Sequence, residues 1–148
     1  MSGTIIFIIL IIAFFVIRTL LKFRGELDAD SAELKNQKIE EKFKVLIDGL
    51  NEYCYYGAGK ITKIDKRSLN IYEQGSCQIV NLEYSTGILT IIWKFKYFHQ
   101  EMVYKRNLSN ARDVNKEWQM NALNIIIPEF LEQYKIHENK VKSSGIVG

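Results

Sequence analysis

The sequence predicts an α+β protein, in which an N-terminal transmembrane helix precedes a small α-β-β-β-β-α domain with an antiparallel four-strand meander. Two observations predict this class. Ile5–Ile17 is an unbroken apolar run. Beyond it, apolar residues recur at helical spacing, then at every second position, then at helical spacing again. The 148 residues suffice for one compact domain with an appendage, and exclude a large multidomain enzyme.

The segment Thr4–Phe23 has the length of a membrane span, which needs about 20 mostly apolar residues. Arg18 is tolerated near its end because a long basic side chain carries its charge to the level of the lipid phosphates. A cleaved signal peptide would have its positive charge before the apolar run. Here Arg18, Lys22 and Arg24 follow it. We therefore expect residues 1–24 to be a retained anchor with a basic flank.

The same basic residues predict the orientation, because Lys and Arg accumulate on the cytoplasmic flank of a span. We expect the N-terminus to be outside and the chain after about residue 24 to be cytoplasmic, in the inner membrane of a cell. In an organelle inner membrane, the equivalent side is the matrix or stroma. Cys54 and Cys77 are too few for a disulfide framework and lack metal-ligand spacing, which fits two free thiols on the reducing side.

Residues 25–30 interrupt the apolar pattern and predict a short acidic linker. We expect Asp30 to cap the helix that follows, with Glu33 completing a capping box. A stripe at spacings of four and three predicts a helix over about residues 31–54. Gly57 and Gly59 are expected to end it. The stripe consists of Ile39, Phe43, Leu46, Leu50 and Tyr53.

Alternation of apolar and polar residues then predicts strands. Lys60–Lys66 is a weak first stretch, and Leu69 and Ile71 alternate with polar neighbours in the next. Further stretches lie at 78–84, at 88–98, which has the clearest pattern, and at 101–106. Short connections favour an antiparallel meander, for which we expect four strands with two helices covering one face.

A last helix is predicted from Ser109 or Asn110 through Tyr134, because apolar residues again recur at helical spacing. Pro128 lacks an N–H group and is expected to kink or restart this helix. The domain should therefore cover residues 31–137, and residues 138–148 should form a flexible tail.

Motifs that carry chemistry are absent from the sequence: there is no phosphate-binding G-x-x-x-x-G-K-[ST], no H-E-x-x-H and no C-x-x-C. Cys77 and His99 are a conceivable nucleophile and base. We expect adjoining strands to place them at opposite ends, which favours a structural thiol and a turn histidine. We therefore predict no catalytic residue, no metal and no cofactor.

Charge is distributed unevenly. Residues 26–53 carry eight acidic and four basic side chains, whereas residues 54–112 carry nine basic and four acidic. A basic sheet close to a membrane fits anionic lipid head groups, an acidic protein or RNA, of which RNA fits least because no strand has a basic-aromatic signature. Lysines that keep an exposed sheet soluble are the alternative explanation. The candidate interaction face comprises Lys60, Lys63, Lys66, Arg67, Lys94, Lys96, Lys105 and Arg106.

These observations favour a single-pass membrane protein whose domain acts by binding, as an accessory or scaffolding subunit of a membrane protein complex. The plan of an apolar N-terminal helix leading into a sheet resembles that of the type IV pilin-like proteins, which implies an export component with an exterior domain. Those proteins have a basic leader ending in Gly and a Glu in the apolar helix, whereas here no basic residue precedes Gly3 and the apolar run contains no Glu. A small enzyme using Cys77 and His99 is the third alternative.

Overall fold

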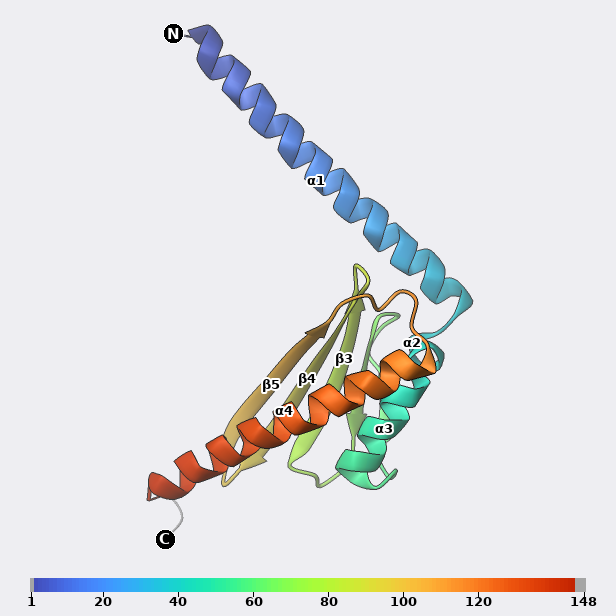
Figure 1. Cartoon of the computed structure of the whole chain (residues 1–148), viewed down its shortest axis with the longest axis vertical. Coiled ribbons are helices and arrows are strands. Elements are labelled where there is room, and N and C mark those ends of the chain that lie inside the picture. Colours follow the sequence, from blue (N-terminus) through green and yellow to red (C-terminus); the bar gives the residue numbers. More distant parts are fainter. Residues whose placement is uncertain (1, 146–148) are drawn as a thin grey trace.

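The computed structural model of the chain confirms the α+β class (Figure 1). It describes residues 2–145, with side chains from residue 8 onward. An N-terminal helix leads into a five-stranded antiparallel sheet and a long C-terminal helix. The elements are α1 (Ser2–Asn36), α2 (Ile39–Lys42), α3 (Lys44–Tyr55), β1 (Lys60–Lys63), β2 (Ser68–Tyr72), β3 (Gln78–Ser85), β4 (Ile88–Tyr97), β5 (Gln100–Leu108) and α4 (Lys116–Ser143).

Helix α1 continues without a break through residues 25–30, where the sequence predicted a linker. Gly25 has open space around it, and the residues after it contact the domain through the carbonyls of Glu26 and Leu27 and the side chain of Asp30, as described below. Figure 1 shows the N-terminal part of α1 extending away from the sheet. No helix within the described residues is both long enough and apolar enough for a membrane crossing. The first part of the predicted span, residues 4–7, lies outside the residues whose side chains are described.

The single helix predicted over about 31–54 is wrong, because the chain is interrupted after Asn36 and again at Phe43. At the second interruption, the side chain of Gln119 from α4 forms hydrogen bonds with the backbone groups that the break leaves free. This side chain is only 6% exposed. Its amide nitrogen donates to the Lys42 carbonyl at 3.1 Å, and its amide oxygen accepts from the Leu46 N–H at 3.0 Å. Buried backbone groups that a helix break leaves free need such partners. One glutamine from a distant helix therefore stabilises the break.

The predicted meander is confirmed, but the expected count of four strands is wrong. The sheet has five strands in the order β1-β2-β3-β4-β5, and each pair of neighbours is antiparallel. Each of the alternating stretches in the sequence forms a strand, including the short β1, whose four residues are all exposed. Two-residue turns connect the longest strands, with positive φ at Thr86 and Gly87 between β3 and β4 and at Phe98 and His99 between β4 and β5. Such turns match the twist of a hairpin and fix its register.

The core lies between one face of the sheet and helices α3 and α4. Trp93 of β4 is fully buried, and its ring stacks on Phe130 of α4 with centroids 3.6 Å apart. Its indole N–H donates to the Gln78 side chain at 2.9 Å. Gly49 allows α3 to approach α4, because a Cβ at this position would lie 2.4 Å from a methyl carbon of Leu123. The stretch with the clearest alternation in the sequence, β4, therefore contributes the largest side chain of the core.

Helix α4 begins later and continues further than the sequence predicted. It starts at Lys116, after Asn115 accepts the Trp118 N–H at 2.7 Å, so the predicted start at Ser109 or Asn110 is wrong. The helix continues through Pro128. It also includes residues 138–143 of the predicted tail, where Val141 is fully buried and Tyr97 donates to Glu138 at 3.4 Å. Residues 146–148 lie outside the described residues.

Candidate functional site: the open face of the sheet

The strand register separates the two faces of the sheet, because directly paired residues point to the same side. Figure 1 shows α3 and α4 lying against one side. On the other side, which we call the open face, one row crosses all five strands, and a second row lies beside it. The first row is Lys60, Tyr72, Ile79, Lys94 and Val103, and the second is Thr62, Asn70, Asn81, Ile92 and Lys105.

Four of the eight basic residues in the predicted interaction face lie on the open face: Lys60, Lys94, Lys96 and Lys105. All four are exposed. Two acidic residues, Glu83 and Glu101, share this face, and Glu101 is paired directly with Lys96. The open face is therefore basic, but less so than the whole set of eight residues suggested.

The other four basic residues lie elsewhere. Lys63 is paired with Leu69, and Arg106 with Ile91, so both belong to the helix-covered side. Arg106 forms an ion pair with Glu129 of α4 at 3.2 Å. Lys66 and Arg67 lie in the turn between β1 and β2. Alternation along each strand predicts the face on which a side chain lies, whereas charge does not. Selecting residues by charge alone therefore combined four lysines of the open face with four basic residues that lie elsewhere.

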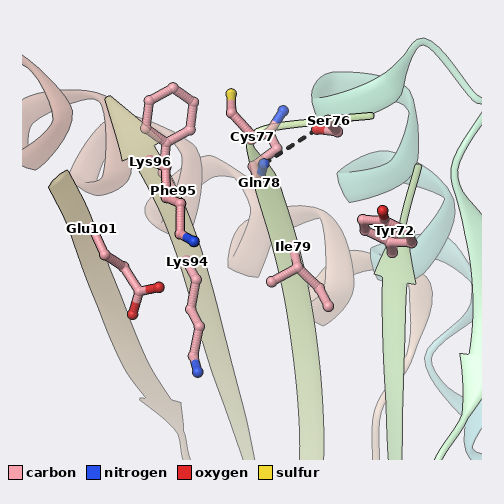
Figure 2. A pocket seen from close by; sticks show the side chains of 9 residues that line it. All are labelled: Tyr72, Ser76, Cys77, Gln78, Ile79, Lys94, Phe95, Lys96 and Glu101. Carbon is pink, nitrogen blue, oxygen red and sulfur yellow. Dashed lines mark hydrogen bonds between the residues drawn. The ribbon is translucent and has the colours of Figure 1, made fainter. Parts of the chain in front are cut away.

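A hollow of about 250 Å³ lies at one end of the open face (Figure 2). Its lining comes from the end of β2, the start of β3, the end of β4 and the start of β5. Lys94, Lys96 and Glu101 supply the charges, and Ile79 supplies apolar surface from the open face; Phe95 also lines the hollow, although its ring packs on Tyr134 on the helix-covered side. A second hollow of about 280 Å³ shares Ile79 and Lys94 with the first and continues toward Asn81. Shallow, partly apolar hollows beside lysines suit an acidic protein surface with apolar side chains.

A buried charge cluster holds the C-terminal part of α1 on the domain. Asp30 is fully buried, lies 3.0 Å from the Arg112 guanidinium, and accepts the Thr86 N–H. It is therefore not the helix cap predicted from the sequence. Arg67 donates to the Ser31 hydroxyl at 2.7 Å and to the Leu27 carbonyl at 3.3 Å. These contacts join α1 to the turns between β1 and β2 and between β3 and β4.

The same cluster extends to a buried lysine. Lys42 of α2, 4% exposed, donates to Glu33 of α1 and to the Arg112 carbonyl. Glu33 also accepts the Tyr84 hydroxyl at 2.9 Å. Burial, with this bond to a carboxylate, raises the pKa of Tyr84. Asp30 of the predicted linker and Glu33 of the predicted capping box are therefore internal partners, whereas Asp28 remains exposed.

The N-terminal part of α1 is apolar on every side and has no cover within the described part of the chain. The large apolar side chains between Ile8 and Phe23 are 41–62% exposed. The predicted membrane-flank residues Arg18, Lys22 and Arg24 are also exposed, on the same continuous helix. A helix that is apolar all round is normally covered by a protein core or by lipid.

Cys77 and His99 lie at the same end of the sheet, so the expectation of opposite ends is wrong. Antiparallel pairing brings the start of β3 beside the end of β4, and the Lys96 N–H donates to the Cys77 carbonyl at 2.8 Å. His99 follows in the two-residue turn that reverses the chain between β4 and β5. Cys54 is half-buried, and its burial raises the pKa of the thiol to about 12.

Within residues 2–145, no three His, Cys, Asp or Glu side chains gather in a way that could hold a metal ion. In comparisons with known proteins, no family model, no curated protein and no solved structure matches this chain.

Proposed function

We propose that the chain is a single-pass membrane protein whose domain binds protein partners through the open face, as an accessory or scaffolding subunit of a membrane complex. The observation that carries the proposal is the contrast between the two parts of α1. Its N-terminal part exposes apolar side chains on every side, from Ile8 to Phe23. Its C-terminal part is fixed to the domain through Asp30 and Glu33.

Orientation in this proposal follows from the basic flank. Arg18, Lys22 and Arg24 lie between the apolar part of α1 and the docked part, so the domain is on the cytoplasmic side, or the matrix or stroma side in an organelle. Because α1 is continuous, Asp30 is separated from Phe23 by about 10 Å at ~1.5 Å per residue. The domain is thus held near the head groups at a fixed distance rather than on a flexible tether.

Binding at the open face is supported by its composition. Lys94 and Lys96 lie beside the hollow, to which Ile79 contributes apolar surface from the same face. Apolar surface next to lysines favours a partner that presents carboxylates around an apolar patch, because burial gives affinity and charge complementarity selects the partner. Anionic lipid head groups provide the charge but not the apolar complement.

Membrane attachment and orientation are tested on the full chain in cells. A reporter fused after Gly148 should be active in the cytoplasm, and protease added from outside should leave the domain uncut. The matched variant Leu10→Lys/Phe14→Lys should release the protein from membranes, because two central lysines cost about 5–7 kcal/mol in a span. Neither side chain contacts the domain in the described structure.

A second variant tests the orientation alone. Replacing Arg18, Lys22 and Arg24 with Gln while placing lysines at Ser2 and Gly3 should reverse the reporter result. Recovery of the wild-type protein in the soluble fraction would overturn the anchor. Digestion of the wild-type domain from outside would overturn the orientation and support the pilin-like alternative.

A further inference from the structure

The two edges of the sheet differ in a way that indicates a pairing surface. Strand β1 has four residues, all exposed, and carries Lys60 and Lys63. Short, lysine-bearing edges resist pairing with another strand. Strand β5 forms the opposite edge with nine residues and no proline, and Val103, next to its central residue, is 50% exposed. Within the described part of the chain, no strand pairs with its outer side.

The register shows which backbone groups of β5 face outward. The Lys96 N–H donates to the carbonyl of Cys77, the residue just before β3, so the even residues of β4 turn their backbone groups toward β3 and the odd residues toward β5. The odd residues of β4 are paired with even residues of β5, as Trp93 is with Tyr104. The odd residues of β5 therefore present free N–H and C=O groups: Glu101, Val103, Lys105 and Asn107.

We infer that β5 is a homodimerisation strand, which pairs antiparallel with β5 of a second copy about a twofold axis at Val103. This register places Val103 opposite itself and Glu101 opposite Lys105 of the other copy, twice by symmetry. All these residues are odd, so their outward backbone groups meet and form about six backbone hydrogen bonds. The charges of the strand are thus complementary to themselves.

Other registers lose this match. An axis at Lys105 places that lysine opposite its own copy, and an axis at Glu101 does the same for the glutamate. An axis at Met102 or Tyr104 leaves a charge opposite Val103. Like charges directly opposite one another destabilise a strand pair, whereas opposite charges stabilise it. The sequence of β5 therefore selects one register as well as one partner.

The same register accounts for further exposed apolar surface. Phe98, in the turn before β5, is 50% exposed, and this pairing brings it beside Leu108 of the other copy. A groove of about 300 Å³ lies there between β5 and α4, and Ile125, 41% exposed, contributes to it. The dimer would form one continuous ten-stranded sheet, since the two β5 strands join two five-stranded sheets. Both open faces would then lie on the same side.

Disulfide crosslinking of the full chain tests the register, in a Cys54→Ala/Cys77→Ser background. Directly opposed residues in a hydrogen-bonded pair have Cα atoms about 5.5 Å apart, within reach of a disulfide. Val103→Cys should crosslink at least about tenfold faster than Ile61→Cys on the β1 edge, because pairing raises the local thiol concentration. Glu101→Cys and Lys105→Cys should each crosslink poorly alone and efficiently when the two proteins are co-expressed.

Dissociation measured by analytical ultracentrifugation in mild detergent tests the energetics. Glu101→Lys should weaken the dimer about fivefold, and adding Lys105→Glu should restore it, because the pair is then merely exchanged. Val103→Pro should abolish the dimer while leaving the β4–β5 ladder intact, since the Val103 N–H points outward. Val103→Thr, which keeps that N–H, is the matched control and should retain the dimer.

The inference is overturned if the wild-type chain is monomeric over the accessible concentration range, or if Val103→Cys crosslinks no faster than Ile61→Cys. Self-crosslinking of Glu101→Cys or Lys105→Cys that exceeds the mixed reaction would overturn the register. If Val103→Pro unfolds, as judged by circular dichroism, the crosslinking rates still decide the question.

Discussion

The Asp30 carboxylate of α1 and the Arg112 guanidinium, from the loop before α4, lie 3.0 Å apart, and Asp30 is completely buried. Arg112 remains partly exposed, with 37% of its side chain accessible. Its guanidinium also donates to the Glu26 carbonyl of α1 at 3.4 Å. The pair is therefore one of two ion pairs, with Glu33–Lys42, that join the N-terminal helix to the domain.

Breaking this pair from the arginine side should destabilise the protein strongly. Arg112→Ala leaves a buried carboxylate without its counter-charge, and we expect a loss of about 3 kcal/mol in the free energy of unfolding. Asp30→Asn should cost less, because the Asn side chain can still accept the Thr86 N–H. Denaturant unfolding measures both, with Asp48→Ala in the exposed Lys44–Asp48 pair as a control that should change stability by less than about 0.5 kcal/mol. Equal costs for the Arg112 and Asp48 variants would contradict the role of the buried pair.

This pair also shows what the sequence could and could not predict. The periodic pattern predicts the meander, the long strand over 88–98 and the helix-covered face, because each depends on alternation or helical spacing within one segment. The role of Asp30 depends on Thr86 and Arg112, which are far away in the sequence. An acidic residue after an apolar helix has the same local pattern whether it is solvated or paired, so local reasoning predicts a linker and a cap.

The candidate interaction face was also predictable only in part. Lys94 and Lys96 alternate with Trp93 and Phe95, so their placement on the open face follows from the strand period. Arg106 is misassigned by charge alone, because its pairing with Ile91 and its ion pair with Glu129 require the register. Gln119 gave no periodic signal at all, since its partners are the backbone groups at a helix break.

Alkaline pH should destabilise the protein through its buried tyrosines. Burial, reinforced by hydrogen bonds to Glu33 and Glu129, raises the pKa of Tyr84 and that of Tyr104. In the unfolded chain both phenols ionise near pH 10, so above that pH the unfolded state binds fewer protons than the folded state. Their contribution is fully present below about pH 10 and is lost as the pH rises beyond it. The free energy of unfolding, measured from pH 8 to 11.5, should therefore fall above about pH 10.

Tyr104→Phe should make this fall shallower, because one titrating group is removed, although it lowers stability at neutral pH by about 1 kcal/mol through the lost hydrogen bond. Tyr56→Phe is the control, since that side chain is 91% exposed, and it should leave the slope unchanged. A slope that Tyr104→Phe does not alter would contradict the assignment.

The two cysteines should react at very different rates in the folded protein. Cys77 is exposed, whereas Cys54 is half-buried and its pKa is raised to about 12. At pH 8, only about one in 10⁴ of the Cys54 side chains is therefore in the reactive thiolate form. Mass spectrometry after brief alkylation should find one label, on Cys77, and two labels after denaturation. Cys77→Ser should abolish the fast label. Comparable rates at both thiols in the native state would show that the α3 terminus opens readily.

Reversing two lysines should identify what the open face binds. Lys94→Glu/Lys96→Glu changes its charge by four units while leaving Trp93 and Phe95 in the core. We expect a stability loss of no more than about 1 kcal/mol, mainly from placing Glu opposite Glu101. Partners that co-purify with the full chain in mild detergent should be lost at least about tenfold, and more so at low salt, because like charges oppose their encounter.

The matched control for this reversal is Lys63→Glu/Lys116→Glu, which has the same net charge but lies outside the open face. Co-purification should be unaffected by it.

Binding to vesicles that contain anionic lipid provides a second comparison. If both reversals weaken vesicle binding equally and neither changes the co-purifying proteins, vesicle binding depends only on the net charge of the protein. The open face would then be a solvated surface, and α1 or the covering helices would carry the association. Loss of partners from the open-face variant alone would instead place recognition on the surface formed by Lys94 and Lys96 beside Ile79, because only that surface differs between the two variants.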